Sequence, residues 1–138
     1  MGTTVSSYLL LVRDTTPEVY ATMTPAETRQ CLDRWNAWVD EMAATGKLRD
    51  GQPLGEKARL VSGKRGEKIT DGPFAEAKEL VGGYFLLEGV TLDDATAMAQ
   101  RCPLLPHGMT VEVRPVAAVC HLATSLGWET MRGPAGPG

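Results

Sequence analysis

The hydrophobic and polar residues of this chain alternate in patterns that predict strands separated by helices. Residues 8–12 form a short, continuous apolar run, which is typical of a buried strand. Residues 110–114 alternate instead, with Val111 and Val113 on one face and polar side chains on the other. Residues 83–88 predict a third strand, and residues 48–54 predict a poorer strand that glycine interrupts.

Two helices are predicted between these strands. Thr24 precedes Pro25 and Glu27, which is the pattern of a helix start with a capping box. The helix is expected over residues 25–45, and its apolar residues recur at helical spacing: Leu32, Trp35, Val39 and Met42. A second helix is expected to begin after Thr91 and to end before Pro103, with four residues buried: Leu92, Ala95, Met98 and Ala99.

The remaining segments are predicted to be connections. Residues 13–23 are polar and contain Pro17, so a loop is expected there. Residues 58–62 and 67–70 flank Gly63-Lys64-Arg65-Gly66, which predicts a hairpin. Residues 116–128 are apolar enough to pack somewhere, for instance on a partner subunit. Residues 132–138 are rich in glycine and proline and are expected to be disordered.

This order of elements predicts an α+β fold of the ferredoxin-like type. It contains two split β-α-β units, which form an antiparallel sheet with both helices on one face. The strands are too apolar to leave the other face in water. A second copy of the same sheet is the simplest cover, so we expect a homodimer.

Composition limits the choice of function. The chain has 138 residues, enough for one domain, and a net charge of −3, which makes nucleic acid an unlikely partner. No segment is long and apolar enough for a membrane helix, and no secretory signal is found at the start. Three widely separated cysteines indicate reduced thiols in a cytoplasmic protein.

Several short motifs, in order, resemble a known family. Asp71-Gly72-Pro73-Phe74 is predicted to form a turn before a short helix-forming stretch, and it resembles the signature of the DGPF branch of the YCII-related family. The resemblance covers residues 6–116, so we expect a family domain over residues 1–116 and an extension over residues 117–138. Further matching motifs are Met23-Thr24-Pro25-Ala26-Glu27, Trp35-Asn36-Ala37-Trp38, Gly51-Gln52-Pro53-Leu54, Cys102-Pro103 and Val111-Glu112-Val113-Arg114-Pro115.

The resemblance implies a dimeric α+β barrel and leaves the function open. Similar proteins include enzymes that act on small cyclic or unsaturated molecules, one branch being a dehalogenating enzyme. In the wider family, a histidine on the first helix and an aspartate have been suggested as an acid/base pair. The first helix of this chain has no histidine, so only Asp71 is carried over. Many members of the DGPF branch resemble proteins encoded beside, or fused to, alternative sigma factors.

Six residues are candidates for a site. Asp71 is either a general acid or base or a carboxylate that accepts turn N–H groups. Arg114 and Glu112 share one face of a strand, where Arg114 either clamps an anionic ligand or pairs with an acidic group across strands or subunits. Tyr84 and Trp35 either shape a pocket or belong to the core or the dimer interface.

His107 lies in a loop rich in proline and glycine, where it is either an acid/base group or a surface residue. No spacing of histidines and cysteines fits a metal site, no phosphate loop is found, and no cofactor is expected. Three hypotheses therefore stay open. The protein is a cofactor-free acid/base enzyme (an isomerase, a lyase or a dehalogenase-like enzyme) for a small anionic or aromatic molecule, or a regulatory ligand-binding module beside a sigma factor, or a purely structural dimer.

Overall fold

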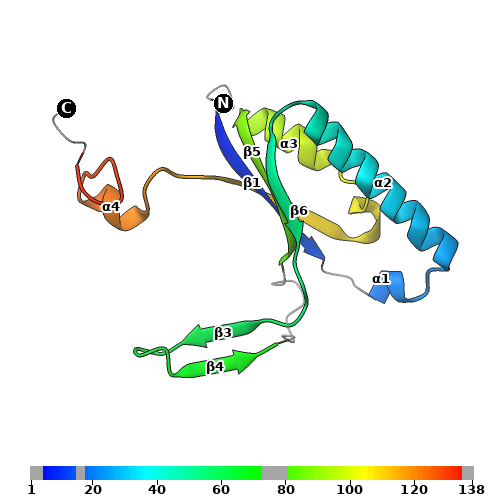
Figure 1. Cartoon of the computed structure of the whole chain (residues 1–138), viewed down its shortest axis with the longest axis horizontal. Helices are drawn as coiled ribbons and strands as arrows, with labels where there is room; N and C mark the ends of the chain where they lie inside the picture. Colours follow the sequence, from blue (N-terminus) through cyan, green and yellow to red (C-terminus); the bar gives the residue numbers. More distant parts are fainter. Residues whose placement is uncertain (1–4, 15–17, 73–80, 135–138) are drawn as a thin grey trace.

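A computed structural model describes residues 5–14, 18–72 and 81–134. Its main feature is a four-stranded antiparallel sheet in the order β2-β5-β1-β6. The strands are β1 (Ser6–Asp14), β2 (Leu48–Pro53), β5 (Val81–Val90) and β6 (Met109–Pro115). With two helices on one face, this is the expected ferredoxin-like α+β fold (Figure 1).

Two capped helices cover one face of the sheet. In α2 (Pro25–Ala44), the Thr24 hydroxyl accepts a hydrogen bond from the Glu27 N–H at 3.1 Å, and the Glu27 side chain accepts one from the Thr24 N–H. Thr91 and Asp94 form the same capping box at the start of α3 (Leu92–Gln100). Both predicted helix starts are therefore confirmed, because the caps depend only on neighbouring residues.

The predicted loop over residues 13–23 is partly wrong. Strand β1 continues to Asp14, and a short helix, α1 (Glu18–Ala21), follows before the N-cap Thr24. The strand is longer than its apolar run because Arg13 and Asp14 pair with β6 across the ladder. A short 3₁₀ helix, η2 (Leu105–His107), lies near α1 at the same end of the sheet, since the rings of Tyr20 and His107 are 6.1 Å apart.

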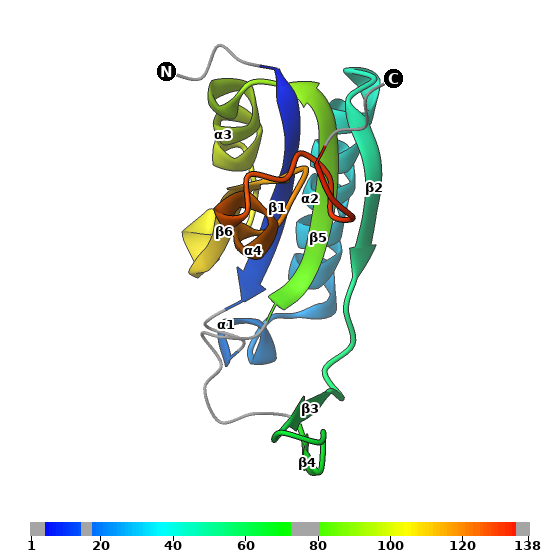
Figure 2. The same ribbon diagram turned by 90° about the vertical axis from the view of Figure 1, so that its left-hand side faces the viewer.

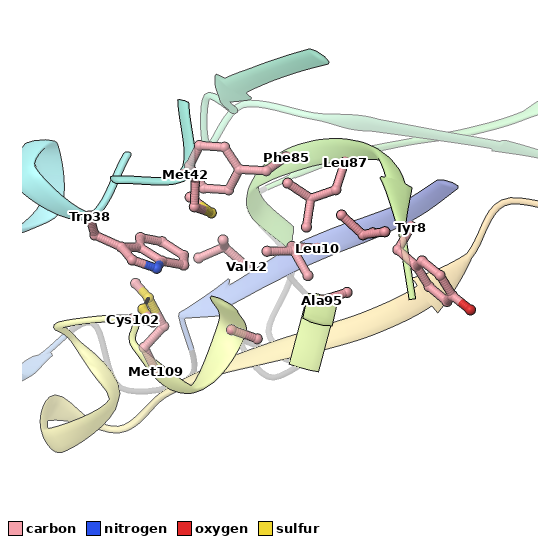
Figure 3. Close-up of a cluster of buried hydrophobic side chains, with 12 residues drawn as sticks. Tyr8, Leu10, Val12, Trp38, Met42, Phe85, Leu87, Ala95, Cys102 and Met109 are labelled. Carbon is pink, nitrogen blue, oxygen red and sulfur yellow. Dashed lines mark hydrogen bonds between the residues drawn. The ribbon is translucent and has the colours of Figure 1, made fainter. Parts of the chain in front are cut away.

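The core lies between the sheet and the helices (Figure 3). Leu10 and Leu87 from the sheet and Met42 from α2 are almost completely buried. Trp38 is anchored as well, because its Nε1 donates a hydrogen bond to the Met98 carbonyl at 2.9 Å. Two predicted core residues are instead exposed. Leu32 is 56% exposed, and Leu92, the first residue of α3, is 40% exposed.

The predicted hairpin is an arm that leaves the sheet after β2 and returns before β5 (Figure 1). We call the paired strands β3 (Arg59–Ser62) and β4 (Lys68–Asp71) the arm. Gly63 and Gly66 adopt φ values of 92° and 70° at its tip, which favour glycine. Every residue of both strands is exposed. The predicted turn lies partly outside the described residues, which stop at Gly72 before Pro73 and Phe74. The helix-forming stretch predicted after the turn also lies outside them.

The second face of the sheet carries no helix, and we call it the helix-free face. The register places Leu9, Leu11 and Leu86 there, all half-buried. The C-terminal segment, which includes α4 (His121–Ser125), extends on this side of the molecule, as does the arm (Figures 1 and 2). Only Ala123 of α4 is buried, whereas Leu122 and Leu126 are each 65% exposed, so the segment has little packing within its own chain. Residues 135–138 lie outside the described residues.

Candidate functional site

A cleft of about 640 Å³ lies between α2 and the sheet, toward β2 and β5. It opens on the face of the sheet that the helices cover, at the end where β1 runs toward α1. Two glycines form part of its floor. A Cβ atom on Gly51 would lie 2.4 Å from Cδ1 of Phe85, and one on Gly83 would lie 3.0 Å from the Gln52 carbonyl oxygen. Neither position therefore has room for a side chain: Gly51 lets the Phe85 ring lie against β2, and Gly83 lies close to the backbone of β2.

An aromatic cluster forms the apolar wall of the cleft. The Trp35 ring lies 5.0 Å from that of Trp38 and 6.0 Å from that of Phe85, and the Trp38 and Phe85 rings are 5.4 Å apart. The Trp38 ring meets both of the others edge to face, a favoured arrangement for aromatic pairs. Trp35 and Phe85 line the cleft, while Trp38 is buried behind them. The wall is thus held rigidly between α2 and β5.

Polar groups gather at one end of the cleft. Asp14 comes from the end of β1, Tyr20 from α1 and Cys31 from α2, and all three line the cleft. Cys31 Sγ lies 3.9 Å from Met23 Sδ. Burial, together with the negative charge of Asp14, raises the pKa of Tyr20 to about 12. Tyr20 is therefore a neutral phenol at physiological pH, next to a carboxylate.

A model of the YCII-related domain matches residues 7–118 of the chain. The chain belongs to the YCII-related family. No curated protein matched the chain.

Two predicted site residues line the cleft of this YCII-related domain. Trp35 belongs to the aromatic wall, whereas Tyr84 borders the cleft from β5 but is the register partner of Leu11, so its side chain lies on the helix-free face. The Tyr84 hydroxyl, however, donates a hydrogen bond to Asp50 Oδ2 at 2.8 Å. That hydrogen bond raises the pKa of Tyr84. The predicted role of Tyr84 in ligand binding stays a prediction, and its hydroxyl already has a partner.

Glu112 and Arg114 lie away from the cleft, on the helix-free face. They are cross-strand neighbours of Leu11 and Leu9 in the register. Glu112 Oε1 accepts a hydrogen bond from Arg13 Nη2 at 2.8 Å, and Glu112 Oε2 lies 3.2 Å from Arg114 Nε. Glu112 thus pairs across strands with Arg13, whereas Arg114 pairs with Glu112 on its own strand. The other reading, an anion clamp formed by Arg114, stays a prediction.

The two predicted catalytic residues are not brought together. Asp71 lies on the arm, 72% exposed, with Oδ1 accepting a hydrogen bond from Arg59 Nε at 2.7 Å. His107 lies in η2, and its ring packs at 6.1 Å from that of Tyr20, just beyond the residues that line the cleft. His107 is therefore near the polar end of the cleft, and Asp71 is not.

The sequence reasoning missed Asp14, Tyr20 and Cys31 as site residues. The first two lie in the segment that was read as a polar loop, and Cys31 was read as one of three reduced thiols. One signal could have found Tyr20, since an aromatic residue with a polar tip in a short polar connection often lies beside a pocket. Within the described residues, no group of three or more metal-binding side chains occurs. Nor does the described part of the chain contain a helix long and apolar enough to cross a membrane.

Proposed function

We propose that this YCII-related protein binds a small, largely apolar, ring-containing molecule in the cleft between α2 and the sheet. One observation carries the proposal: the cleft combines an aromatic wall with a few polar groups at one end. This is the usual make-up of a small-molecule site, and its volume of about 640 Å³ lies within the common range of ~300–1,000 Å³. A molecule with one or two rings fits this volume.

The charge of the cleft restricts the ligand further. Asp14 is the acidic group among the lining residues, and no arginine or lysine lines the cleft in the described part of the chain. Arg114 lies on the other face of the sheet, beside Glu112. An anion in this cleft would therefore meet the negative charge of Asp14. Of the two expected ligand classes, anionic and aromatic, the cleft favours an aromatic or alicyclic molecule without a negative charge.

The cofactor-free acid/base chemistry implied by the family resemblance would use groups in this cleft. A proton transfer needs a base and an acid or hydrogen-bond donor within reach of the same bound molecule. Asp14 supplies a carboxylate, and Tyr20 supplies a phenol that keeps its proton at physiological pH. Isomerisation or elimination of a bound ring compound is the reaction class that these two groups support. Asp71 and His107 are not among the residues that line this cleft.

A screen of compounds by thermal shift, with two matched variants, tests ligand binding. In Thr28→Trp, an indole is added on the side of α2 that lines the cleft. In Gln30→Trp, the same group is added at an exposed position of α2 that does not line it. We expect neutral ring compounds to raise the melting temperature of the wild type and of Gln30→Trp. A ligand at one hundred times its dissociation constant stabilises the fold by ~2.7 kcal/mol.

We expect the same compounds to bind Thr28→Trp at least about tenfold more weakly, because the indole occupies part of the cleft. Equal binding to both variants would place the ligand elsewhere on the protein. If a broad set of neutral ring compounds leaves the wild type unchanged, the proposed function is wrong. Titration of each hit by calorimetry gives the dissociation constants.

We also propose that the protein is a homodimer through the helix-free face. Leu9, Leu11 and Leu86 form an apolar stripe there, and a second copy is the cover that buries it symmetrically. The charges support this arrangement. Two cations, Arg13 and Arg114, accompany Glu112 on the β6 side of the sheet, whereas Asp50 lies on β2 at the opposite edge. Two sheets stacked about a two-fold axis along the strands would bring each basic side over the acidic edge of its partner.

The association with a sigma factor stays a prediction, which co-purification of the two proteins would test. For the setting of the protein, we propose a reducing compartment such as the cytoplasm. Its three cysteines, Cys31, Cys102 and Cys120, are free thiols, which supports this proposal.

A further inference from the structure

The arm presents an apolar face that its own chain does not cover. Val61 and Ile69 are register partners, so their side chains lie together on one face of the hairpin. Both are mostly exposed, as is every other residue of β3 and β4. A two-stranded hairpin is marginally stable in water unless it packs on something. We call this surface the Val61–Ile69 face, and it needs an apolar partner.

The open end of the cleft presents exposed apolar side chains of the same kind. Leu32 lines the cleft from α2 and is mostly exposed. Val19 on α1 and Leu105 in η2 are also exposed, and they adjoin the lining residues Tyr20 and Leu104. We call Val19, Leu32 and Leu105 the mouth of the cleft. The mouth is thus a second apolar surface that faces solvent.

The arm of a protomer points away from the mouth of its own cleft. It extends on the helix-free side of the sheet, whereas the cleft opens on the side of the helices (Figures 1 and 2). A second copy on the helix-free face would occupy the side toward which the arm extends. A two-fold axis along the strands, which the charges of the sheet favour, keeps the same ends of both sheets together. The arm of one protomer then lies at the end where the partner's cleft opens.

The arm is long enough to reach that mouth. Residues 54–63, from the end of β2 to the tip of the arm, are ten residues and span at most about 33–36 Å. Stacked sheets lie ~10 Å apart, and a helix is ~10–12 Å across. The partner's cleft, between its sheet and its helices, therefore lies within this span.

The charge of the arm fits a second copy of the chain. Residues 59–71 carry four basic and two acidic side chains, a charge of +2 in a chain whose net charge is −3, so the remaining residues carry −5. At the mouth, α1 contains Glu18 and no basic residue. Complementary charges of this kind guide association and fix the register of two surfaces.

We propose that the arm of each protomer covers the mouth of the partner's cleft with its Val61–Ile69 face, so that both chains complete each ligand site. The walls of a cleft then come from one chain and its cover from the other. This inference rests on the proposed function and the proposed dimer, and it adds the segment that closes the site. The contact removes the apolar side chains of both surfaces from water.

The thiol of Cys31 reports whether the mouth is covered, without any ligand. Cys31 lines the cleft and is a free, half-buried cysteine. The rate of its alkylation by iodoacetamide is measured by mass spectrometry of the peptide that contains it. We expect Cys31 to react at least about tenfold more slowly in the wild-type dimer than in Leu86→Arg at concentrations where that variant is monomeric.

Two matched double variants assign the protection to one face of the arm. Val61→Glu with Ile69→Lys replaces the apolar pair by a cross-strand ion pair, which a hairpin accommodates. Leu60→Glu with Thr70→Lys makes the same change on the other face. We expect the first variant to lose the protection of Cys31 while sedimentation still shows a dimer, and the second to keep it. Equal loss in both would assign the protection to folding of the arm, and the inference would be wrong.

Mixed dimers show which chain supplies the cover. The Val61→Glu/Ile69→Lys chain is mixed with an excess of a Cys31→Ser chain whose arm is unchanged. In a mixed dimer the remaining Cys31 faces the unchanged arm of its partner, so we expect its protection to return. If the protection does not return, the arm does not act on the partner and the inference is overturned.

These outcomes are separate from those of the ligand screen, because alkylation requires no bound compound. A dimer in which Cys31 reacts as fast as in the monomer overturns this inference and leaves the proposed function in place. A protected Cys31 together with a screen that finds no binder supports the contact and rejects the proposed function. A wild type that remains monomeric overturns the dimer and this inference together.

Discussion

At the scale of single residues, the pKa of Tyr20 depends on the nearby Asp14 carboxylate. The carboxylate and the burial of the ring keep the Tyr20 phenol protonated far into the alkaline range. A donor in an apolar cleft is useful only if it keeps its proton, because a phenolate there would be costly to bury. Trp35 and Phe85 supply aromatic surface to the same cleft.

The raised pKa of Tyr20 predicts a loss of stability in alkali. The folded state keeps the phenolic proton up to about pH 12, whereas the unfolded chain releases it near pH 10.0. Between these values the unfolded state binds fewer protons, so the free energy of unfolding falls as the pH rises. Urea denaturation of the wild type and Tyr20→Phe, below pH 10 and between pH 10 and 12, measures this.

We expect the wild type to lose more stability than Tyr20→Phe across that interval. The difference between the two proteins removes the contribution of other alkaline groups, among them the Cys102 thiol, whose pKa is raised by burial. A parallel loss in both proteins would mean that Tyr20 titrates alike in the folded and unfolded states. The difference in phenolate absorbance between the wild type and Tyr20→Phe reports the titration of Tyr20, because the other two tyrosines are common to both proteins.

At the scale of elements, aromatic rings and glycines set the spacing around the cleft. Large rings hold α2 away from the β2–β5 pair, and glycines let a ring and a strand backbone come close. Trp35 and Trp38 on α2 meet Phe85 on β5, and these rings set the spacing between helix and sheet. Gly51 on β2 lets the Phe85 ring lie against the strand backbone. The arrangement therefore requires a large side chain at Phe85 on β5 and no side chain at Gly51 on β2.

Substitution of Gly51 by alanine tests this pairing. The new Cβ would lie 2.4 Å from Phe85 Cδ1, so the ring has to move toward the cleft. We expect a loss of ~1–3 kcal/mol in the free energy of unfolding, as for other overpacked positions. A matched control is Gly55→Ala, where a Cβ would meet no atom within 4 Å.

The control should be neutral, or more stable by ~0.4–1 kcal/mol, because alanine restricts the unfolded chain. Urea denaturation of both variants gives the two values. If Gly51→Ala proves as stable as Gly55→Ala, Phe85 does not pack against the β2 backbone as described. Weaker ligand binding by Gly51→Ala than by Gly55→Ala would further connect this packing to the cleft.

At the scale of the whole molecule, one side of the protein is better covered than the other. The helices cover one face of the sheet, and the arm and the C-terminal segment extend away from it (Figures 1 and 2). Apolar side chains of the arm and of the C-terminal segment are exposed to solvent, and those of the helix-free face are half-buried. Val61 and Ile69 on the arm are 66% and 60% exposed. A two-stranded hairpin alone is marginally stable in water. A second copy seated on the helix-free face would lie between the arm and the C-terminal segment.

Sedimentation over a concentration series tests the proposed dimer. We expect the wild type to be dimeric and Leu86→Arg, on the helix-free face, to weaken association at least about tenfold, because it buries an unpaired charge. The matched control Leu92→Arg places the same charge on the helix layer, at a position that is 40% exposed. Association should be unchanged in the control. A wild type that stays monomeric at every concentration would overturn the proposal.

The sequence reasoning succeeded where neighbours along the chain decide the outcome. The capping box at Thr24 and the helix start after Thr91 were predicted from neighbouring residues, and the structure confirms both. The strands were found by the same local patterns, with errors only at their ends, as where β1 continues to Asp14. The prediction of which side chains are buried was less accurate. Leu32 matches the helical stripe, but it lines the open cleft and is 56% exposed.

The candidate site was predicted less well, for a physical reason. Asp71 was chosen because of its turn motif, but the arm carries it away from the cleft. Arg114 and Glu112 were correctly placed on one face, and the pairing of β1 with β6 gives Glu112 a cation in Arg13 that no local pattern indicates. Tyr20 was missed because its importance depends on what surrounds its hydroxyl.

The sequence alone determined the order of strands and helices, the helix caps and the apolar face of each strand. Each of these depends on residues that lie a few positions apart. The position of the cleft was decided only by the tertiary structure. Its lining comes from β1, α1, α2, β2 and β5, and packing brings together residues as distant as Asp14 and Gly83. An enclosed space between elements has no local signature, because it is the volume that their side chains leave unfilled.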